Sequence, residues 1–311
     1  MINTPWGNLR VIDAHTHFFS HQFFQTFARL AQDNLPADAP LVAIAQRLGI
    51  EIPSADPQSL AQRWVGEMDT YGIERMVMFT SVPGDHLSVA AAVKAFPERI
   101  VGYLMLDPTQ PGAADQLRDS VQHHGLKGVT LFPAMHHFHA HEARVYPLYR
   151  AAAEFGIPVF VHFGVLKVSI REKLGLPNMF DLRYSNPTDL HKVAIDFPAV
   201  NFIIPHFGCG YLRETLMLGA QAPNVFVDTS SSNTWLAYMP SPLDLKTVFE
   251  KTLQVFGPRR ILFGTDSNVF PRGWRQDIFH QQVEILRQLD MPLDAAEAML
   301  GGNIARLLAR S

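Results

Sequence analysis

Short apolar runs alternate with longer amphipathic segments along most of the chain. Each run is nearly continuous in apolar residues, which is typical of parallel strands that are buried on both faces. Gly and Pro mark many of the joints, as at Gly156 and Pro158. The runs predicted as strands are 11–19, 75–81, 100–107, 128–133, 158–164, 201–208, 224–230 and 261–267.

The segments between these runs carry the apolar spacing of helices that bury one face. Helices are predicted at 86–96, 113–123, 143–155, 189–197, 211–220, 243–256, 275–289 and 293–309. Eight strands that alternate with helices predict an α/β fold, a (β/α)8 TIM barrel, with residues 1–311 as one domain.

The interval between the first and second predicted strands is longer than the others. Residues 21–62 contain several prolines, including Pro36, together with amphipathic stretches. A disordered linker would expose apolar side chains such as Phe23 and Phe27, so we expect an ordered cap inserted over the barrel mouth. The helix that follows the first strand is then expected at 59–71.

Composition narrows the classes of function. The chain has 311 residues, of which 47% are hydrophobic and 18% charged, and its formal net charge is -3. Such interspersed charge excludes an electrostatic site for nucleic acid or for an acidic membrane surface. The one cysteine, Cys209, excludes an internal disulfide and fits a reducing compartment. Because we find neither a signal peptide nor an apolar run of transmembrane length, we predict a cytoplasmic protein with no membrane partner.

Four of the predicted strands end in residues that bind metals. The first carries His15 and His17, and later strands carry His162, His206 and Asp266. Side chains at i and i+2 of a strand point to the same face, so His15 and His17 project together. Neutral imidazole and carboxylate suit zinc and similar ions, and barrel enzymes place their chemistry at the carboxyl ends of the strands. The candidate ligands are His15, His17, His162 and Asp266.

Each of these residues also has a simpler interpretation. A His-x-His sequence occurs by chance, and a lone His162 or His206 at a strand end is often a hydrogen-bonded core histidine. Asp266 follows Gly264 and Thr265 and fits the cap of a turn or helix. Four coincidences at equivalent positions of four strands nonetheless favour a metal site, in which His206 would contact a water on the ion.

Three further segments resemble the amidohydrolase superfamily, in the branch that includes aminocarboxymuconate-semialdehyde decarboxylase and related hydrolases. They lie before the second strand, at the fourth strand and before His162, at residues 64–73, 127–133 and 146–158. With the ligand motifs, the resemblance spans nearly the whole chain outside the insertion. It implies a barrel enzyme with a mononuclear metal site.

The resemblance also implies roles for individual residues. The ion, expected to be zinc with manganese as the alternative, would be bound by His15, His17, His162 and Asp266. The catalytic residues would be His206 and Asp266. Relatives with two metals carry a bridging lysine at the end of strand four, whereas Lys127 lies at the beginning of that strand here. This departure favours a single ion.

The same ligands serve two reactions. The first interpretation is a hydrolase of a small carbonyl compound, such as a cyclic ester, an amide or a ring-cleavage product, which uses water activated by the metal. The alternative is a non-oxidative decarboxylase of an aromatic or muconate-like acid. A phosphoesterase that begins with His-x-His would require a richer set of ligands. An inactive barrel that serves as a binding protein would lack one of them.

Residues near the same strand ends are candidates for binding substrate. Arg272 and Arg275 follow the eighth strand and suit a carboxylate, with a surface position as an equal alternative. Trp274 and Phe18, with Phe19, suit an aromatic wall, for which ordinary packing is the stronger alternative. The expected partner is a small molecule, with a carboxylate as one option. A homodimer is expected only by analogy with family members.

Two polar loops contain further residues that could bind substrate or metal. The loop after the fourth strand holds His136, His137, His139 and His141. Such a cluster suggests a second metal site, although surface histidines are the favoured interpretation, with His136 or His137 as a contact to substrate. The hydroxyls after the seventh strand either meet substrate or satisfy the turn backbone. They belong to Thr229, Ser230 and Ser231.

Overall fold

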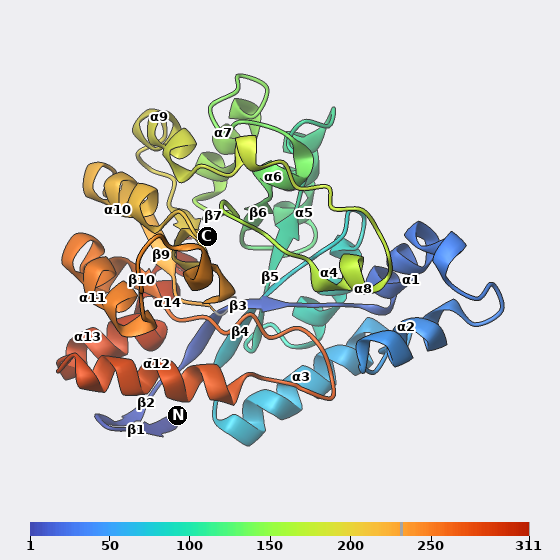
Figure 1. Ribbon diagram of the computed structural model, residues 1–311, viewed down its shortest axis with the longest axis horizontal. Coiled ribbons are helices and arrows are strands. Elements are labelled where there is room, and N and C mark those ends of the chain that lie inside the picture. Colours follow the sequence, from blue (N-terminus) through green and yellow to red (C-terminus); the bar gives the residue numbers. More distant parts are fainter. Residues whose placement is uncertain (231–232, 311) are drawn as a thin grey trace.

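Eight parallel strands form a barrel surrounded by helices in the computed structural model, which describes residues 1–230 and 233–310 (Figure 1). The strands neighbour one another in chain order from β3 to β10, each parallel to the next. Their bounds are β3 Ile12–His17, β4 Arg75–Phe79, β5 Ile100–Met105, β6 Val129–Leu131, β7 Val159–Val161, β8 Phe202–Ile204, β9 Val225–Asp228 and β10 Ile261–Leu262. The predicted (β/α)8 barrel is confirmed, with strands shorter than the apolar runs.

Helices follow the strands as predicted, with ends that move by a few residues. They are α3 Pro57–Tyr71, α4 His86–Ala95, α5 Ala113–Gln122, α7 Tyr146–Phe155, α9 Leu190–Asp196, α10 Leu212–Gln221, α11 Leu245–Phe256 and α12 Gln276–Gln288. Within the described part of the chain, no helix is both long and apolar enough to cross a bilayer.

The last predicted helix, 293–309, is divided into α13 Leu293–Glu297, a π-helical turn Ala298–Gly302 and α14 Asn303–Leu308. The turn lies against the first barrel strand, because a Cβ on Gly301 would come 2.9 Å from the carbonyl oxygen of Arg10. The carbonyl of Met299 accepts a hydrogen bond from the backbone N–H of Phe263 at 3.0 Å. Contact with the barrel therefore overrides the regular helix.

The barrel closes between β10 and β3 through irregular backbone rather than a long ladder. The strand predicted at 261–267 is regular only for its first two residues, Ile261–Leu262. Beyond it, Asp266 N–H donates to the carbonyl of His15 at 2.9 Å, and His17 N–H donates to that of Ser267 at 2.8 Å. A Cβ on Gly264 would lie 2.8 Å from the Cβ of His15. This close approach brings Asp266 beside the His-x-His strand.

The inserted segment is folded. It contains α1 His21–Leu30 and α2 Pro40–Leu48, which lie with α8 Ser169–Lys173 at one end of the molecule (Figure 1). Buried Phe24 and Ile44 form a separate apolar cluster with Ile170 and others. The helix predicted from 59 begins at Pro57, where the Asp56 carboxylate accepts from two backbone N–H groups.

The sequence analysis missed the first hairpin, β1 Ile2–Thr4 with β2 Gly7–Leu9. Its strands have three residues each, too few to display a period of two. Trp6 anchors this hairpin, since its indole N–H donates to the carbonyl of Met291 at 2.7 Å.

Candidate metal centre

Four predicted ligands converge at the carboxyl end of the barrel. His15 and His17 lie on β3, His162 directly follows β7, and Asp266 lies in the loop after β10. The Nε2 atoms of His15 and His17 are 3.4 Å apart, and Asp266 Oδ1 is 3.1 Å from Nε2 of His17. One ring nitrogen from each of the three histidines lies within 4.8 Å of the others. The three histidines therefore share one small space, and Asp266 borders it beside His17.

The chemistry of these donors fits a divalent ion. Nε2 of His162 is buried and has no hydrogen-bond partner in the described chain. Burial, followed by the neighbouring His15 and His206, lowers the pKa of His162 well below its ordinary value, so the ring is neutral. A neutral imidazole with a free lone pair is the form that binds metal, and an ion would satisfy this buried nitrogen.

Each candidate histidine is oriented through its other ring nitrogen. His15 Nδ1 donates to Oδ2 of Asp228 at 2.7 Å, and both side chains are fully buried. A hydrogen bond of 2.8 Å joins Nδ1 of His17 to the hydroxyl of Ser81, and one of 3.0 Å joins Nδ1 of His162 to that of Thr130. Such partners fix the tautomer and the direction of metal-ligating histidines.

These orienting residues were missed by the sequence analysis. Asp228 is the last residue of β9, at the end of an apolar stretch. The search for metal-binding residues at strand ends, which found His162, would also have found it. Ser81 and Thr130 gave no comparable signal, because hydroxyl residues are common in and after strands.

The Asp266 carboxylate is held as an anion. Burial by itself raises its pKa, but the hydrogen bond from His17 and the nearby histidines outweigh burial, so the pKa lies below the usual range. Its backbone has a φ of 60°, a left-handed conformation that is uncommon outside glycine and is maintained by the bond to the carbonyl of His15. The side chain keeps 18% of its surface exposed and can meet a ligand from the barrel mouth.

His206 lies beside the four ligands. It follows β8, is 4% exposed and has a φ of 56°. Its ring centre is 4.8 Å from that of His15 and 5.8 Å from that of His162. The Ser230 hydroxyl bonds Nδ1 of His206 at 2.8 Å and also donates to Asp228. A hydrogen-bonded chain thus links His206 to the Asp228 carboxylate that orients His15.

Aromatic side chains close the barrel beneath the centre. Phe79, Tyr103 and Phe160 are fully buried inside the barrel. The ring centre of Phe79 is 4.7 Å from that of His15, and that of Phe160 is 5.7 Å away. This apolar floor keeps water from the lower side of the ligands.

The candidate substrate residues divide into two groups. Arg272 is exposed at the surface, as its alternative interpretation expected, and its pKa is lowered by partial desolvation and by Arg275, while the nearby Asp266 acts to raise that pKa. Its guanidinium donates to Oδ1 of Asn268 at 2.5 Å. His136 is partly buried, and its Nδ1 finds no partner in the described chain. Both can still accept a contact from a ligand.

The other three are engaged elsewhere. Phe18 is fully buried in the core, and Trp274 is 3% exposed with its indole N–H donating to Asp13 at 2.9 Å. Arg275 pairs with Asp277 at the start of α12, at 2.6 Å. Packing and an ion pair account for these side chains. Of the predicted hydroxyls, that of Thr229 contacts Gln282 at 2.5 Å, and Ser231 lies outside the described residues.

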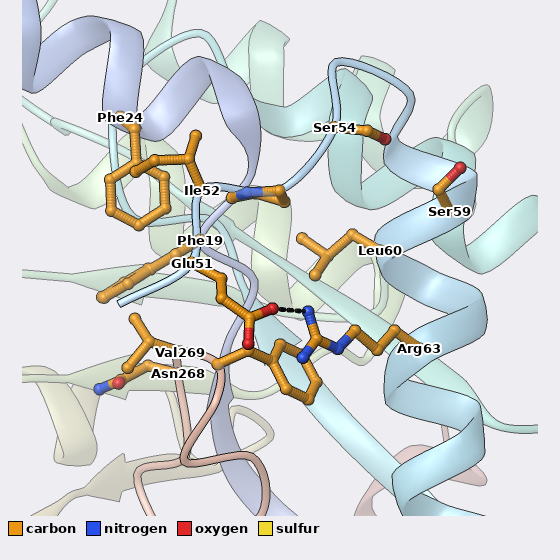
Figure 2. A pocket seen from close by; sticks show the side chains of 12 residues that line it. Phe19, Phe24, Glu51, Ile52, Ser54, Ser59, Leu60, Arg63, Asn268 and Val269 are labelled. Atoms are coloured by element: carbon orange, nitrogen blue, oxygen red, sulfur yellow. Dashed lines mark hydrogen bonds and ion pairs between the residues drawn. The ribbon is translucent and has the colours of Figure 1, made fainter. Parts of the chain in front are cut away.

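A cavity of about 210 Å³ adjoins the centre (Figure 2). It lies between the cap, α3 and the loop after β10, and its wall includes the Glu51–Arg63 ion pair. Phe19 borders it, and the Phe19 ring centre is 5.4 Å from that of His17. Asn268, which also borders it, donates to the backbone carbonyl of Asp266 at 3.2 Å. The cavity is thus separated from the ligands by one layer of side chains.

Comparison with known proteins identifies a family whose sequence model matches this chain. The sequence model of a family described as amidohydrolase matches residues 12–310. A stretch of 94 residues is 29% identical to Protein fluG of Emericella nidulans and covers 30% of this chain and 10% of that protein. The chain therefore corresponds to a small part of that relative.

Solved structures share the fold at low identity. An uncharacterized TIM-barrel protein, Bb4693, of Bordetella bronchiseptica is 24% identical over 97% of this chain and 99% of its own, with a TM-score of 0.65. The 5-carboxyvanillate decarboxylase of Novosphingobium aromaticivorans, complexed with manganese and 4-hydroxy-3-methoxy-5-nitrobenzoic acid, is 16% identical over 98% and 97%, with a TM-score of 0.66. An amidohydrolase of Burkholderia multivorans with bound zinc is 16% identical over 96% and 99%, with a TM-score of 0.58.

Proposed function

Because this chain belongs to the amidohydrolase family, we propose that it is a metal-dependent hydrolase of a small carbonyl compound. One observation carries the proposal. Ring nitrogens of His15 and His17 lie within 4.8 Å of that of His162, whose buried Nε2 has no partner in the described chain, and the Asp266 carboxylate lies beside His17. The complete set of donors, with His206 beside it, argues against the alternative of an inactive binding protein.

We assign one divalent ion to His15, His17, His162 and Asp266. Bound there, it would supply Lewis acidity that polarises a substrate oxygen and makes water more acidic. Zinc remains our first expectation and manganese the alternative, since relatives of the same fold carry one or the other. Lys127 is exposed at the beginning of β6, away from these donors, which supports a site for one ion.

The chain's own residues would move the protons. Asp266 is an anion at neutral pH and can accept a proton from an attacking water. Since Ser230 occupies Nδ1 of His206, its Nε2 is the ring nitrogen that can meet a substrate. His206 in its protonated form would deliver the proton on Nε2 to the leaving oxygen or nitrogen, and solvent would then take the proton from Asp266 and return one to His206. The Ser230–Asp228 pair keeps this ring in position meanwhile.

Arg272 suggests that the substrate carries a carboxylate. Its side chain is exposed, its guanidinium is within reach of the charge of Asp266, and Asn268 is its neutral hydrogen-bond acceptor. A planar carboxylate is the natural partner for such a group. The neighbouring cavity offers room for a substituent away from the reacting carbon.

A decarboxylase is the second candidate. Arg272 and the metal would hold a carboxylate at the centre, which is also the requirement for losing carbon dioxide. The decarboxylase of the same fold was solved with a substituted benzoic acid bound. In that reaction His206 would deliver a proton to the ring carbon as carbon dioxide leaves.

Product analysis separates the two candidates. Metal-reconstituted protein would be incubated with lactones, cyclic amides and hydroxylated aromatic acids, and acid formation and carbon dioxide release would both be followed. Ring opening without carbon dioxide supports the hydrolase, and carbon dioxide from an acid supports the decarboxylase. The Arg272→Gln variant should raise KM for carboxylate substrates and spare neutral ones. If no substrate in any class turns over with zinc or manganese, the proposal fails.

A further inference from the structure

A second group of metal-binding side chains lies outside the candidate centre. His139 and His141 belong to the loop after β6, whereas Asp189 ends a short 3-10 helix, Pro187–Asp189, in the segment after β7. His139 Nδ1 lies 2.5 Å from Oδ2 of Asp189, and His141 Nδ1 lies 3.7 Å from Oδ1 of the same carboxylate. The three ligand atoms are all within 4.8 Å of one another.

We propose that His139, His141 and Asp189 form a second divalent-cation site, suited to zinc. Two imidazoles approach the two oxygens of one carboxylate, but only one of the two distances is short enough for a hydrogen bond. Zinc–ligand distances near 2.1 Å place the ligand atoms of one tetrahedral ion roughly 3.4 Å apart. The observed distances lie on either side of this value, so small side-chain rotations would complete the geometry.

The site is open to solvent. The side chains of His139 and His141 are 39% and 50% exposed, whereas that of Asp189 is 18% exposed. Tyr184 packs against the group, with its ring centre 4.8 Å from that of His139. Three protein ligands and an exposed side leave at least one position for water, unlike a structural zinc site that is closed by four protein ligands.

An ion here would join two segments at the barrel mouth. The chain between α8 and α9 passes beside α6, Pro133–His136 (Figure 1). Besides the contact between His139 and Asp189, two hydrogen bonds connect these segments: Asp181 N–H donates to the carbonyl of Ala134 at 2.9 Å, and His137 Nε2 donates to that of Met179 at 2.8 Å. The cation would replace the contact between His139 and Asp189 by a stronger connection and fix the loop that follows His162.

Zinc titration of the metal-free full chain, with a chromophoric zinc chelator as competitor, tests this site. Wild-type protein should take up a second equivalent of zinc that His139→Ala/His141→Ala lacks and that His15→Ala/His17→Ala retains. Asp189→Asn should lose more affinity at this step than the roughly 10- to 100-fold typical of a removed outer partner. Circular dichroism checks that each variant is folded.

A matched control uses another histidine pair. His123 and His124 flank Asp119 on α5, and they are absent from the three-ligand groups of the described residues. The His123→Ala/His124→Ala variant should therefore keep both equivalents. Loss of the second equivalent in this control, its persistence in His139→Ala/His141→Ala, or uptake by wild type of only one equivalent that His139→Ala/His141→Ala retains would each overturn the proposal. Failure of the candidate centre would appear separately: His15→Ala/His17→Ala would then take up as much zinc as wild type.

Discussion

At the scale of residues, Asp228 is the least obvious contributor to the candidate centre. Its carboxylate is fully buried, and burial raises its pKa, but the interaction with His15 and the hydrogen bond from Ser230 lower that pKa below its ordinary value. An anion at this position increases the electron density of the His15 imidazole and holds its ring. Because its Oδ2 accepts from Nδ1 of His15, we assign Asp228 the role of positioning that histidine rather than of binding the ion.

The Asp228→Asn variant tests this role. The amide keeps the shape and one acceptor but removes the charge, so we expect about 10- to 100-fold weaker metal binding at the centre with little change of fold. Competition with a zinc indicator measures the loss. Asp38→Asn, at an exposed position, is the matched control. Unchanged affinity in Asp228→Asn would contradict the role.

His206 should matter for turnover and not for metal. In His206→Gln, we expect the metal content to stay at the wild-type level while kcat falls about 100- to 10,000-fold, because a proton donor is lost. Elemental analysis and steady-state kinetics with the substrate identified by the assays above give both readouts. Full activity would remove His206 from the mechanism, and loss of metal would make it a ligand.

At the scale of elements, the junction of β10 and β3 controls the geometry of the centre. Regular pairing stops after Leu262, and the chain then bends so that Asp266 faces the His-x-His strand. Gly264 permits this bend, since a Cβ there would lie 2.8 Å from the Cβ of His15 and 3.2 Å from that of Ser230. The short strand and Gly264 thus let Asp266 approach the His-x-His strand, which a longer regular strand would prevent.

Gly264→Ala should push the chain after β10 away from β3. The added methyl group would displace His15, lowering the free energy of unfolding by about 1–3 kcal/mol and weakening metal binding. Gly66→Ala is the comparison, because its Cβ would meet nothing within 4 Å on the exposed side of α3. That change should stabilise the helix by about 1 kcal/mol. Denaturant unfolding and zinc titration of both variants decide the matter, and an inert Gly264→Ala would refute the argument.

At the scale of the whole molecule, burying neutral histidines makes stability depend on pH. The pKa of His162 lies well below its ordinary value of 6.5 in the fold, so below that pH the unfolded chain binds the proton that the fold excludes. His162 therefore lowers the stability of the metal-free protein as the pH falls below 6.5. Asp13 has the opposite effect on the pH dependence of stability. Burial raises its pKa to about 7, so its contribution to stability increases as the pH falls below that value.

Comparison with His162→Gln isolates the histidine from Asp13. We expect the free energy of unfolding of the metal-free protein to fall less steeply in the variant than in wild type between about pH 6.5 and pH 5. Urea unfolding at several pH values measures both slopes. Equal slopes would mean that the fold does not lower the pKa of His162, which would contradict the neutral, buried imidazole argued for here.

The sequence by itself determined the barrel and the residues proposed to bind the ion. Strand periodicity and burial are local properties, so apolar runs that end in His15, His17, His162 and Asp266 already place these residues on one face of a parallel barrel. The insertion was also recognised, because its apolar side chains require a core. Zinc rather than manganese, a homodimer and a cytoplasmic location stay predictions.

Only the tertiary structure decided which residues support those ligands. Asp228 and His15 are 213 positions apart, and Asp189 lies 50 positions from His139, so no local pattern relates them. Closure of the barrel brings such positions together, and it also directs Trp274 toward Asp13 rather than toward a substrate. The physical reason is that a strand's pattern fixes which face a side chain takes, whereas its partners depend on how the whole sheet curves.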